Sequence, residues 1–307
     1  GYDINSTLIQ NLSKGKNIEN YSSEKNILSL FKKQFDLKKL NFVNNLSVSD
    51  VYIVCVPTPI NSRNKAVTKF VDKALKNISN IIKKNDLVVI ESTIPINYCD
   101  KAYRILKKNL NGKDFYLSYC PERVLPGDTL NEIRKNKRII GGYCKKSANL
   151  TKELYKKFVS GKIYTTSIGV SEFTKLSENA FRDVNIAYAN ELSIICDKNN
   201  VDYSEVIKYA NMHPRVKILN PGIGVGGHCI SVDPWFLIEN YSNNSSIIRN
   251  ARKVNDNKSN YITKKILNII SKNKLKYINE NIFFLGLGYK PNIGDLRSSP
   301  AVKIIKS

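Results

Sequence analysis

An alternation of short apolar runs with amphipathic stretches, between residues 41 and 165, constrains the fold of this chain more than any other feature. The runs are rich in Val, Ile and Tyr, which is typical of strands buried on both faces of a sheet. They occupy residues 51–56, 87–90, 115–118, 138–140 and 162–164. Between the first two runs, residues 67–84 carry apolar side chains at helical spacing. The pattern predicts an α/β fold with βαβ units on a mainly parallel sheet, in which ligands bind at the carboxyl ends of the strands.

The second half of the chain changes to a helical period. Apolar residues recur at helical spacing over residues 171–196 without a Pro or Gly, which predicts one long helix. We expect shorter helices at residues 203–211 and 260–271, a strand at 281–285, and a helix that starts at Ser299. Because a strand, a loop and part of a helix cannot close a core, we expect a further α/β domain beyond Ser307. The chain also opens without an initiating Met, so we expect it to be a fragment.

The composition suggests one class of function that the pattern of strands and helices does not. The 307 residues are 42% hydrophobic, enough for sizeable cores, and carry a formal net charge of +23. Such a charge suggests nucleic acid as a partner, because clustered Lys and Arg neutralise phosphates. The lysines are spread along the whole chain, however, and no aromatic-basic recognition motif accompanies them. A solvated lysine-rich surface is therefore favoured, and we expect no nucleic-acid partner.

The six cysteines and two histidines show neither a C-x-x-C pair nor the spacing of metal ligands. We therefore expect neither a disulfide framework nor a metal site, and a reducing, cytoplasmic setting. The longest apolar runs are far shorter than the roughly 18 residues that a membrane span needs, so we expect no membrane partner.

A glycine-rich segment, residues 221–235, is the most informative candidate site. Its backbone can bend tightly and present N–H groups to an anion. The glycines are Gly222, Gly224, Gly226 and Gly227. Cys229 and Asp233 follow, so a thiol nucleophile and a carboxylate lie beside an anion-binding loop. A buried, inert Cys229 is the alternative, and this context alone does not decide between the two. His228 is assigned a structural role, because adjacent side chains in an extended loop point apart.

Lys175 and Asn179 form a second candidate pair on the predicted long helix. Residues four positions apart lie on one helix face, where a lysine and a carboxamide could both donate to a developing oxyanion. From the residue types alone, a solvated helix face is the favoured interpretation, since Lys and Asn are ordinary surface residues.

The ends of three predicted strands carry polar residues. Thr58 follows the first, Glu91 and Thr93 follow the second, and Glu122 follows the third. These positions fall at the edge of the sheet where ligands bind, and a buried Glu122 could act on water. Turn chemistry explains the Thr and Pro residues there equally well.

Taken together, the motifs resemble one family, the NAD-dependent nucleotide-sugar 6-dehydrogenases. The resemblance covers essentially the whole chain, although any one motif alone would be weak evidence. The motifs are Gly1-Tyr2-Asp3, Pro57-Thr58-Pro59, Glu91-Ser92-Thr93, Tyr119-Cys120-Pro121-Glu122-Arg123, Lys175-Leu176-Ser177-Glu178-Asn179, Gly226-Gly227-His228-Cys229 and Gly288-Tyr289-Lys290-Pro291.

Within this family, residues 181–187, 213–216 and 228–236 are most similar to the enzymes that act on UDP-N-acetyl-D-mannosamine. The resemblance implies a four-electron oxidation in which C6 of the sugar goes from alcohol to carboxylate and two NAD+ are consumed. UDP-N-acetylglucosamine and UDP-glucose remain alternative substrates, because sugar choice depends on the shape of a pocket. A basic nucleic-acid-binding protein and an inactive remnant remain alternatives from different classes.

The resemblance also implies catalytic roles. Cys229 would attack the intermediate aldehyde, and the resulting thiohemiacetal would be oxidised to a thioester. Lys175 and Asn179 would stabilise oxyanions, and Asp233 would order water and assist proton transfer. Glu122 would assist hydrolysis of the thioester.

The binding residues and the domains follow from the same resemblance. The cofactor set is Asp3, which would hold the adenosine ribose of NAD, with Thr58, Glu91, Thr93 and Arg297. The substrate set for the UDP-sugar is Arg215, Gly222, Gly224, Gly226, Gly227 and Lys290. The implied domains are a Rossmann-like NAD-binding domain without its first βα unit (1–166), a central all-helical domain with the catalytic loop (167–271) and the start of a UDP-binding α/β domain (272–307). The implied assembly is a homodimer formed through the central helical domain.

Overall fold

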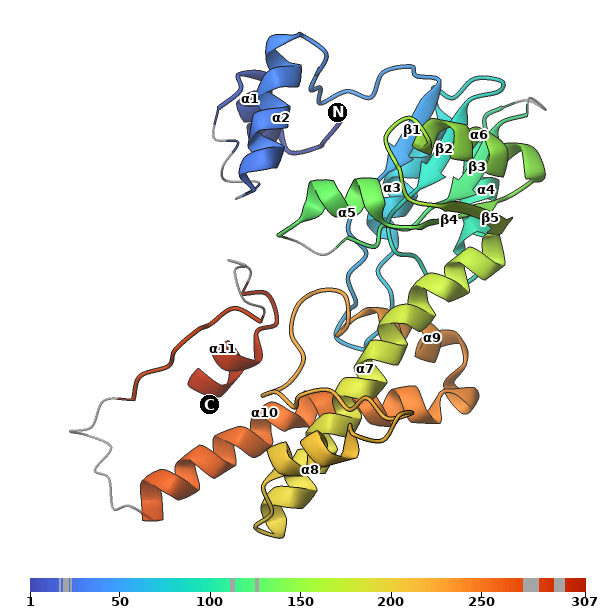
Figure 1. Ribbon diagram of the computed structural model, residues 1–307. Coiled ribbons are helices and arrows are strands. Elements are labelled where there is room, and N and C mark those ends of the chain that lie inside the picture. Colours follow the sequence, from blue (N-terminus) through green and yellow to red (C-terminus); the bar gives the residue numbers. More distant parts are fainter. Residues whose placement is uncertain are drawn as a thin grey trace. The chain divides into compact units, whose positions relative to one another are not determined.

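The structure, a computed structural model, describes residues 1–16, 18, 22, 24–110, 114–124, 127–272, 282–289 and 296–307 (Figure 1). The chain divides into two compact units. The first comprises residues Gly1–Thr58 and Thr68–Phe173, and the second comprises Pro59–Val67 and Thr174–Ser307. The strands of the sheet all lie in the first unit, and the longest helices extend through the second.

The first unit is an α/β structure around a five-stranded sheet with the strand order β1-β2-β3-β4-β5. Its elements are α1 (Ser6–Ser13), α2 (Lys25–Asp36), β1 (Val51–Val54), α3 (Lys69–Ser79), β2 (Leu87–Ile90), α4 (Tyr98–Lys107), β3 (Tyr116–Tyr119), α5 (Thr129–Lys135), β4 (Arg138–Gly142), α6 (Lys145–Tyr155) and β5 (Ile163–Ser167). Neighbouring strands are parallel except β3 and β4, which are antiparallel. The predicted α/β class with a mainly parallel sheet is therefore confirmed.

Strand β2 shows why the sequence pattern predicted this sheet. Val88 and Ile90 belong to the core cluster that includes residues of α3 and α4, whereas Leu87 and Val89 belong to the cluster that includes residues of α6. Successive side chains of a strand point to opposite faces, so a strand covered by helices on both faces needs apolar residues at every position. All of β2 is buried, and it reads as an uninterrupted apolar run.

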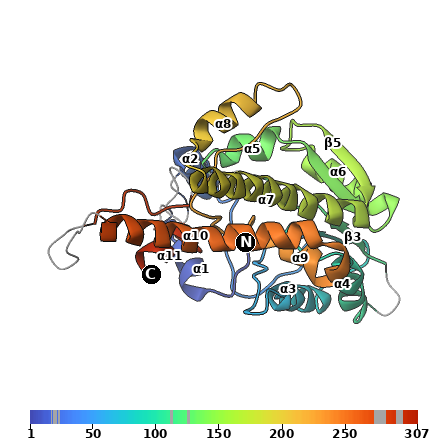
Figure 2. The ribbon, with the colours of Figure 1, turned by 90° about the horizontal axis from the view of Figure 1, so that it is seen from below.

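The second unit is helical. Its elements are α7 (Ile168–Lys198, which begins at the end of the first unit), α8 (Tyr203–Ala210), α9 (Asp233–Asn240), the 3₁₀ helix η2 (Ser242–Asn244), α10 (Ser246–Lys272) and α11 (Pro300–Ile305). Helices α7 and α10 are the long ones, and buried hydrogen bonds join them (Figures 1 and 2). The predicted long helix is thus confirmed, and so is the helical character of this region.

Four sequence-based expectations differ from the structure. The helix expected at residues 260–271 begins much earlier, at Ser246, and the helix expected over 67–84 ends at Ser79. Helix α9, which begins at Asp233, was not predicted. The strand expected at 281–285 was wrong for the described residues 282–285, which form no strand. A strand needs a neighbouring strand to satisfy its backbone groups, and the described part of the chain places none there.

Candidate active site

Helix α7 carries Lys175 and Asn179 on one face, four residues apart, and both side chains are buried. Lys175 is 9% exposed and Asn179 is 7% exposed. The solvated-face interpretation of this pair is therefore wrong. Burying an ammonium group and a carboxamide is costly without polar partners, so this face of α7 is organised around polar groups.

Asp233 is the polar partner that the structure supplies. It is the first residue of α9 and only 3% exposed, and Asn179 Nδ2 donates a hydrogen bond to its Oδ2 at 2.6 Å. The two residues are 54 positions apart in the sequence, so the fold alone brings them together. Pro234 at the start of α9 favours this helix start, because its fixed φ is compatible with a first helical turn.

Cys229 is linked to the same helix start through its backbone. The N–H groups of Asp233 and Val232 donate to the carbonyl oxygen of Cys229 at 2.8 and 3.0 Å. Cys229 itself is exposed. The alternative of a buried, inert cysteine is therefore wrong, and an accessible thiol lies one turn before a buried carboxylate.

Burial sets the proton affinity of this carboxylate. It raises the pKa of Asp233 from its ordinary value to about 6, while the positive charge of Lys175 and the hydrogen bond from Asn179 oppose the rise. A carboxyl group with a pKa near neutral pH can both release and take up a proton at working pH. Asp233 therefore has the property that proton transfer beside a thiol requires.

The glycine-rich loop needs its glycines for close approach and for backbone conformation. Gly227 has φ +83°, and a Cβ there would lie 2.7 Å from the ring of Tyr289. A Cβ on Gly226 would also lie 2.7 Å from Tyr289. The N–H of Gly227 donates to the carbonyl oxygen of Arg297 at 3.1 Å. Tyr289 and Arg297 thus contact the predicted anion-binding loop directly.

The other predicted substrate residues are placed less specifically. Arg215 is exposed on the segment that follows α8, and its N–H donates to His213 Nδ1 at 3.3 Å. Among the described contacts, none joins Arg215 to Cys229 or to the glycine-rich loop. Gly222 and Gly224 lie in that loop, whereas Lys290 lies outside the described residues.

In the first unit, the predicted strand exits lie side by side. Thr58 Oγ1 donates to the carbonyl oxygen of Thr93 at 2.6 Å, which joins the segments that follow the parallel strands β1 and β2. The Glu91 carboxylate accepts hydrogen bonds from the Tyr155 hydroxyl and, at 3.4 Å, from Cys55 Sγ. These contacts build a polar layer at the carboxyl ends of the strands.

Glu122 belongs to this polar layer through a partner that the sequence analysis did not identify. Arg138 Nη1 lies 2.9 Å from Glu122 Oε2, and the Arg138 side chain is buried and stacks over the Tyr155 ring. Arg138 opens β4, and an arginine at the start of an apolar run was the only signal that could have marked it.

Burial raises the pKa of Cys55 and of Cys120 to about 12, so both thiols stay protonated, unlike an activated nucleophile.

The residues of the first unit fit NAD. Its adenosine ribose needs a carboxylate at a strand end, and Asp3 follows Tyr2, which bridges to Val43 in parallel orientation. This pair is an isolated bridge, not part of a longer strand. Asp3 Oδ1 accepts a hydrogen bond from the Asn5 N–H at 2.8 Å. Thr58 and Thr93 place neutral hydroxyl side chains at the neighbouring strand ends, where the Thr58 hydroxyl already donates to the Thr93 carbonyl oxygen and keeps lone pairs free to accept.

Two features are absent from the residues that the structure describes. No group of three or more His, Cys, Asp or Glu residues in that part of the chain is arranged to hold a metal ion. None of the described helices is both long enough and apolar enough to cross a membrane.

Comparison with known proteins gives consistent results for both halves of the chain. A profile of the UDP-glucose/GDP-mannose dehydrogenase family, NAD binding domain, matches residues 1–159, and the profile of that family's central domain matches residues 169–257. The UDP-N-acetyl-D-mannosamine dehydrogenase of Methanococcus maripaludis strain C7 is 44% identical over 310 residues, which cover 100% of this chain and 70% of the relative. The enzyme of that name from Campylobacter jejuni is 45% identical over 84% of this chain and 65% of its own.

Solved structures agree with the sequence relatives. The UDP-D-ManNAc dehydrogenase of Pyrococcus horikoshii matches with a TM-score of 0.92 at 39% identity, over 100% of this chain and 74% of that chain. A UDP-N-acetyl-mannosamine dehydrogenase from Staphylococcus aureus matches with a TM-score of 0.88 at 38% identity, over 100% of this chain and 73% of that chain.

Proposed function

This chain belongs to the UDP-glucose/GDP-mannose dehydrogenase family, and from that premise we propose that it oxidises C6 of UDP-N-acetyl-D-mannosamine from alcohol to carboxylate with NAD as cofactor. The site supports this proposal through one observation above all. An exposed thiol, Cys229, lies one turn before a buried Asp233 that is bonded to Asn179 and close to the charge of Lys175. That set combines a nucleophile, a proton carrier and two oxyanion donors.

Each of the two oxidations transfers one hydride to NAD+. In the first oxidation the C6 alcohol loses a hydride and a proton, and Lys175 and Asn179 stabilise the negative charge that develops on its oxygen. Asp233, whose pKa of about 6 leaves it mostly ionised at neutral pH, assists removal of the proton. The product of this step is an aldehyde.

Cys229 makes the second oxidation possible. Its sulfur adds to the aldehyde carbon and forms a thiohemiacetal. Loss of the hydride from its C–H bond and of the proton from its hydroxyl group leaves a thioester. Water hydrolyses the thioester, which returns the thiol and yields the carboxylate. We assign assistance in this hydrolysis to Glu122, whose carboxylate is oriented by the buried Arg138.

The binding assignments are part of the same proposal. Asp3, Glu91, Thr58, Thr93 and Arg297 form the cofactor set. The substrate set is Arg215, Lys290 and the loop glycines Gly222, Gly224, Gly226 and Gly227. UDP-N-acetyl-D-mannosamine is chosen over UDP-N-acetylglucosamine and UDP-glucose, because the relatives cited above carry that substrate in their names. The six cysteines without a C-x-x-C pair fit the reducing environment of the cytoplasm.

The experiment that tests the function is NADH formation by the protein with NAD+ and each of the three UDP-sugars. UDP-N-acetyl-D-mannosamine should give two NADH per sugar and the highest kcat/KM, at least about tenfold above the gluco-configured sugar. That ratio is reasonable for one inverted substituent, because an acetamido group in the wrong direction leaves a buried polar partner unpaired. An equal or better rate with UDP-N-acetylglucosamine would overturn the choice of sugar, and no NADH from any of the three would overturn the function.

We further propose that a second copy of the chain covers the outer face of α7. Phe181, Tyr188 and Ile195 are 70%, 56% and 53% exposed and recur every seven residues, so they form one apolar stripe along the helix. Contiguous exposed apolar surface of this kind is typical of interfaces between subunits. Light scattering during gel filtration should give the mass of a dimer, and Tyr188→Glu should give a monomer. A monomeric wild-type protein would contradict this proposal.

A further inference from the structure

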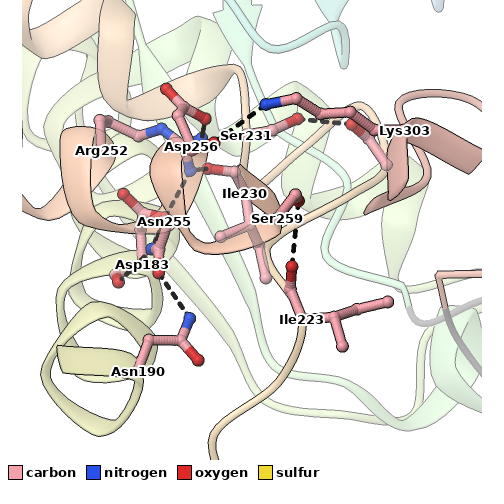
Figure 3. A network of polar contacts seen from close by, with 11 residues as sticks. Asp183, Asn190, Ile223, Ile230, Ser231, Arg252, Asn255, Asp256, Ser259 and Lys303 are labelled. Atoms are coloured by element: carbon pink, nitrogen blue, oxygen red, sulfur yellow. Dashed lines mark hydrogen bonds and ion pairs between the residues drawn. The ribbon is translucent and has the colours of Figure 1, made fainter. Parts of the chain in front are cut away.

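A buried polar network joins α7 to α10 and begins at Asp183, one helical turn after Asn179 (Figure 3). Asp183 on α7 accepts hydrogen bonds at its Oδ1 from Arg252 Nη1 at 2.6 Å and from Asn255 Nδ2 at 2.7 Å, both on α10. Asn190, two turns further along α7, donates from Nδ2 to Asn255 Oδ1 at 2.9 Å. All four side chains are at most 1% exposed. Ordering so many buried polar groups is costly, which calls for a role beyond joining two helices.

The network has a direction, which its contacts with Asp183 set. The backbone carbonyl oxygen and Oδ1 of Asp183 both accept from Asn255 Nδ2, so Asn255 turns its NH2 group toward Asp183 and its oxygen toward Asn190. Asn190 must then turn its own NH2 group toward Asn255, which leaves its Oδ1 facing the other way. That oxygen accepts the N–H of Gly222 at 2.8 Å. The carboxylate thus fixes, through two amides, an acceptor for the first glycine of the glycine-rich loop.

Two further contacts bind the same loop to α10. Ser259 Oγ donates to the carbonyl oxygen of Ile223 at 3.0 Å, and Arg252 Nη1 reaches the carbonyl oxygen of Ile230 at 3.5 Å (Figure 3). Ile230 is the residue after Cys229. The loop is therefore attached at its start, through Gly222 and Ile223, and again at Ile230, directly after Cys229.

We infer that Asn190, Asn255 and Ser259 are positioning residues for the oxidation, because they hold the glycine-rich loop and Cys229 at a fixed place relative to α7. The inference rests on the proposed function. Helix α7 carries both the oxyanion pair and the acceptor for Gly222, so the network ties the nucleophile's loop to the helix that stabilises the charge. Small displacements of a reacting group lower the reaction rate steeply. Rigid attachment of the loop prevents such displacements of Cys229.

Two serines offer a matched test. Ser259 and Ser193 are 4% and 5% exposed and lie on the same pair of helices, but only Ser259 bonds the loop. Ser193 Oγ donates to the Asn190 carbonyl oxygen and accepts from Lys258 Nζ. Changing either serine to Ala removes one buried hydroxyl without adding bulk. Any difference between the two variants therefore reports the contact with the loop and not the loss of a buried hydrogen bond.

The first readout is amide hydrogen exchange of the peptide that covers residues 221–230, which needs no catalysis. Ser259→Ala and Asn190→Leu should exchange at least about tenfold faster there than the wild type, and Ser193→Ala should stay within about twofold. The second readout is kcat/KM at a temperature where all proteins are folded. Asn190→Leu should lose about 30-fold, Ser259→Ala about fivefold and Ser193→Ala no more than twofold.

Equal exchange in Ser259→Ala and Ser193→Ala would overturn the inference, as would equal losses of kcat/KM in these two variants. If Asn190→Leu does not fold, the comparison of Ser259→Ala with Ser193→Ala still tests the inference. A wild-type protein that forms no NADH would overturn the proposed function instead, while the exchange comparison would still test whether the network holds the loop.

Discussion

Helix α7 buries polar side chains in two stretches, and they differ in what surrounds them. At Lys175 and Asn179 the partner is Asp233, beside an exposed thiol, and a single amide hydrogen bond is described for its carboxylate. At Asp183 the partners are a guanidinium and an amide of α10, deep between two helices. Burial raises the pKa of both aspartates, and the neighbouring cation opposes the rise in each case. The comparison teaches that buried polarity alone does not mark chemistry: Asp233 lies beside an accessible reacting group, whereas Asp183 Oδ1 is held by a guanidinium and an amide that are themselves buried.

The largest expected effect belongs to the reactive stretch. Cys229→Ser should lower kcat for acid formation by about 10³-fold or more, because a hydroxyl is a weaker nucleophile and no thioester can form. NADH released per sugar should fall from two to at most one. Cys144→Ser is the control, since Cys144 is exposed and only caps α6, and it should keep normal activity. Undiminished two-NADH turnover by Cys229→Ser would remove this residue from the mechanism.

The next effect belongs to the second stretch and concerns stability. Arg252→Met should lower the free energy of unfolding by about 3–5 kcal/mol, because it leaves the buried Asp183 without its cation. Urea unfolding followed by circular dichroism measures this change. Lys156→Met, which removes one partner of an exposed ion pair, should cost less than about 1 kcal/mol. A loss for Arg252→Met as small as that of Lys156→Met would show that the two helices do not depend on the buried pair.

A smaller effect returns to the reactive stretch. Lys175→Ala and Asn179→Ala should each lower kcat by about 10²-fold at a temperature where the variants are folded, because both donors act on the same developing charge. The double variant should lose clearly less than the product of the two single losses. Near-normal kcat in both single variants would show that Lys175 and Asn179 are structural residues. The two buried polar stretches of α7 would then not differ in function.

The smallest effect is a shift in pH dependence. Asp233 must be ionised to accept a proton, so kcat should rise as pH increases through about 6, and Asp233→Asn should abolish this limb. Its folded-state pKa lies above the ordinary value of 3.8, so the stability it contributes is present below about pH 4 and is lost as pH rises to about 6. Asp233→Asn should therefore lower turnover without lowering stability at pH 7. A loss of stability in this variant at pH 7 would contradict the assignment.

The sequence predicted the parts of the fold that bury apolar residues periodically. The strands stand out as short apolar runs and α7 has a helical period, so their positions were found to within a few residues. The first half of α10 was missed because its buried face is largely polar and shows no apolar period. Arg252, Asn255 and Lys258 hydrogen-bond to α7, and Ser259 hydrogen-bonds to the glycine-rich loop. The aromatic run near Phe283 predicted a strand, but composition alone cannot supply the neighbouring strand that pairing requires.

The candidate site divides in the same way. The spacing of Lys175 and Asn179 was visible because it is local to one helix, and Cys229 was visible from its glycine-rich context. The pairs between Asn179 and Asp233, and between Glu122 and Arg138, join residues of different elements, so no local spacing could reveal them. These pairs could be identified only from the structure, because tertiary packing decides which carboxylate is hydrogen-bonded by an amide and which is paired with a guanidinium.

The most direct test of the account is whether Cys229 carries the sugar during the second oxidation. Enzyme in excess over UDP-N-acetyl-D-mannosamine is mixed with NAD+, quenched in acid over a time course and digested, and the mass of the peptide that bears Cys229 is measured. The proposed mechanism predicts an acyl adduct on Cys229 that appears with the second NADH and decays as the acid forms. In Glu122→Gln this adduct should reach a larger fraction of the enzyme. Release of the second NADH with an unmodified Cys229 at every time point, in both proteins, would contradict it.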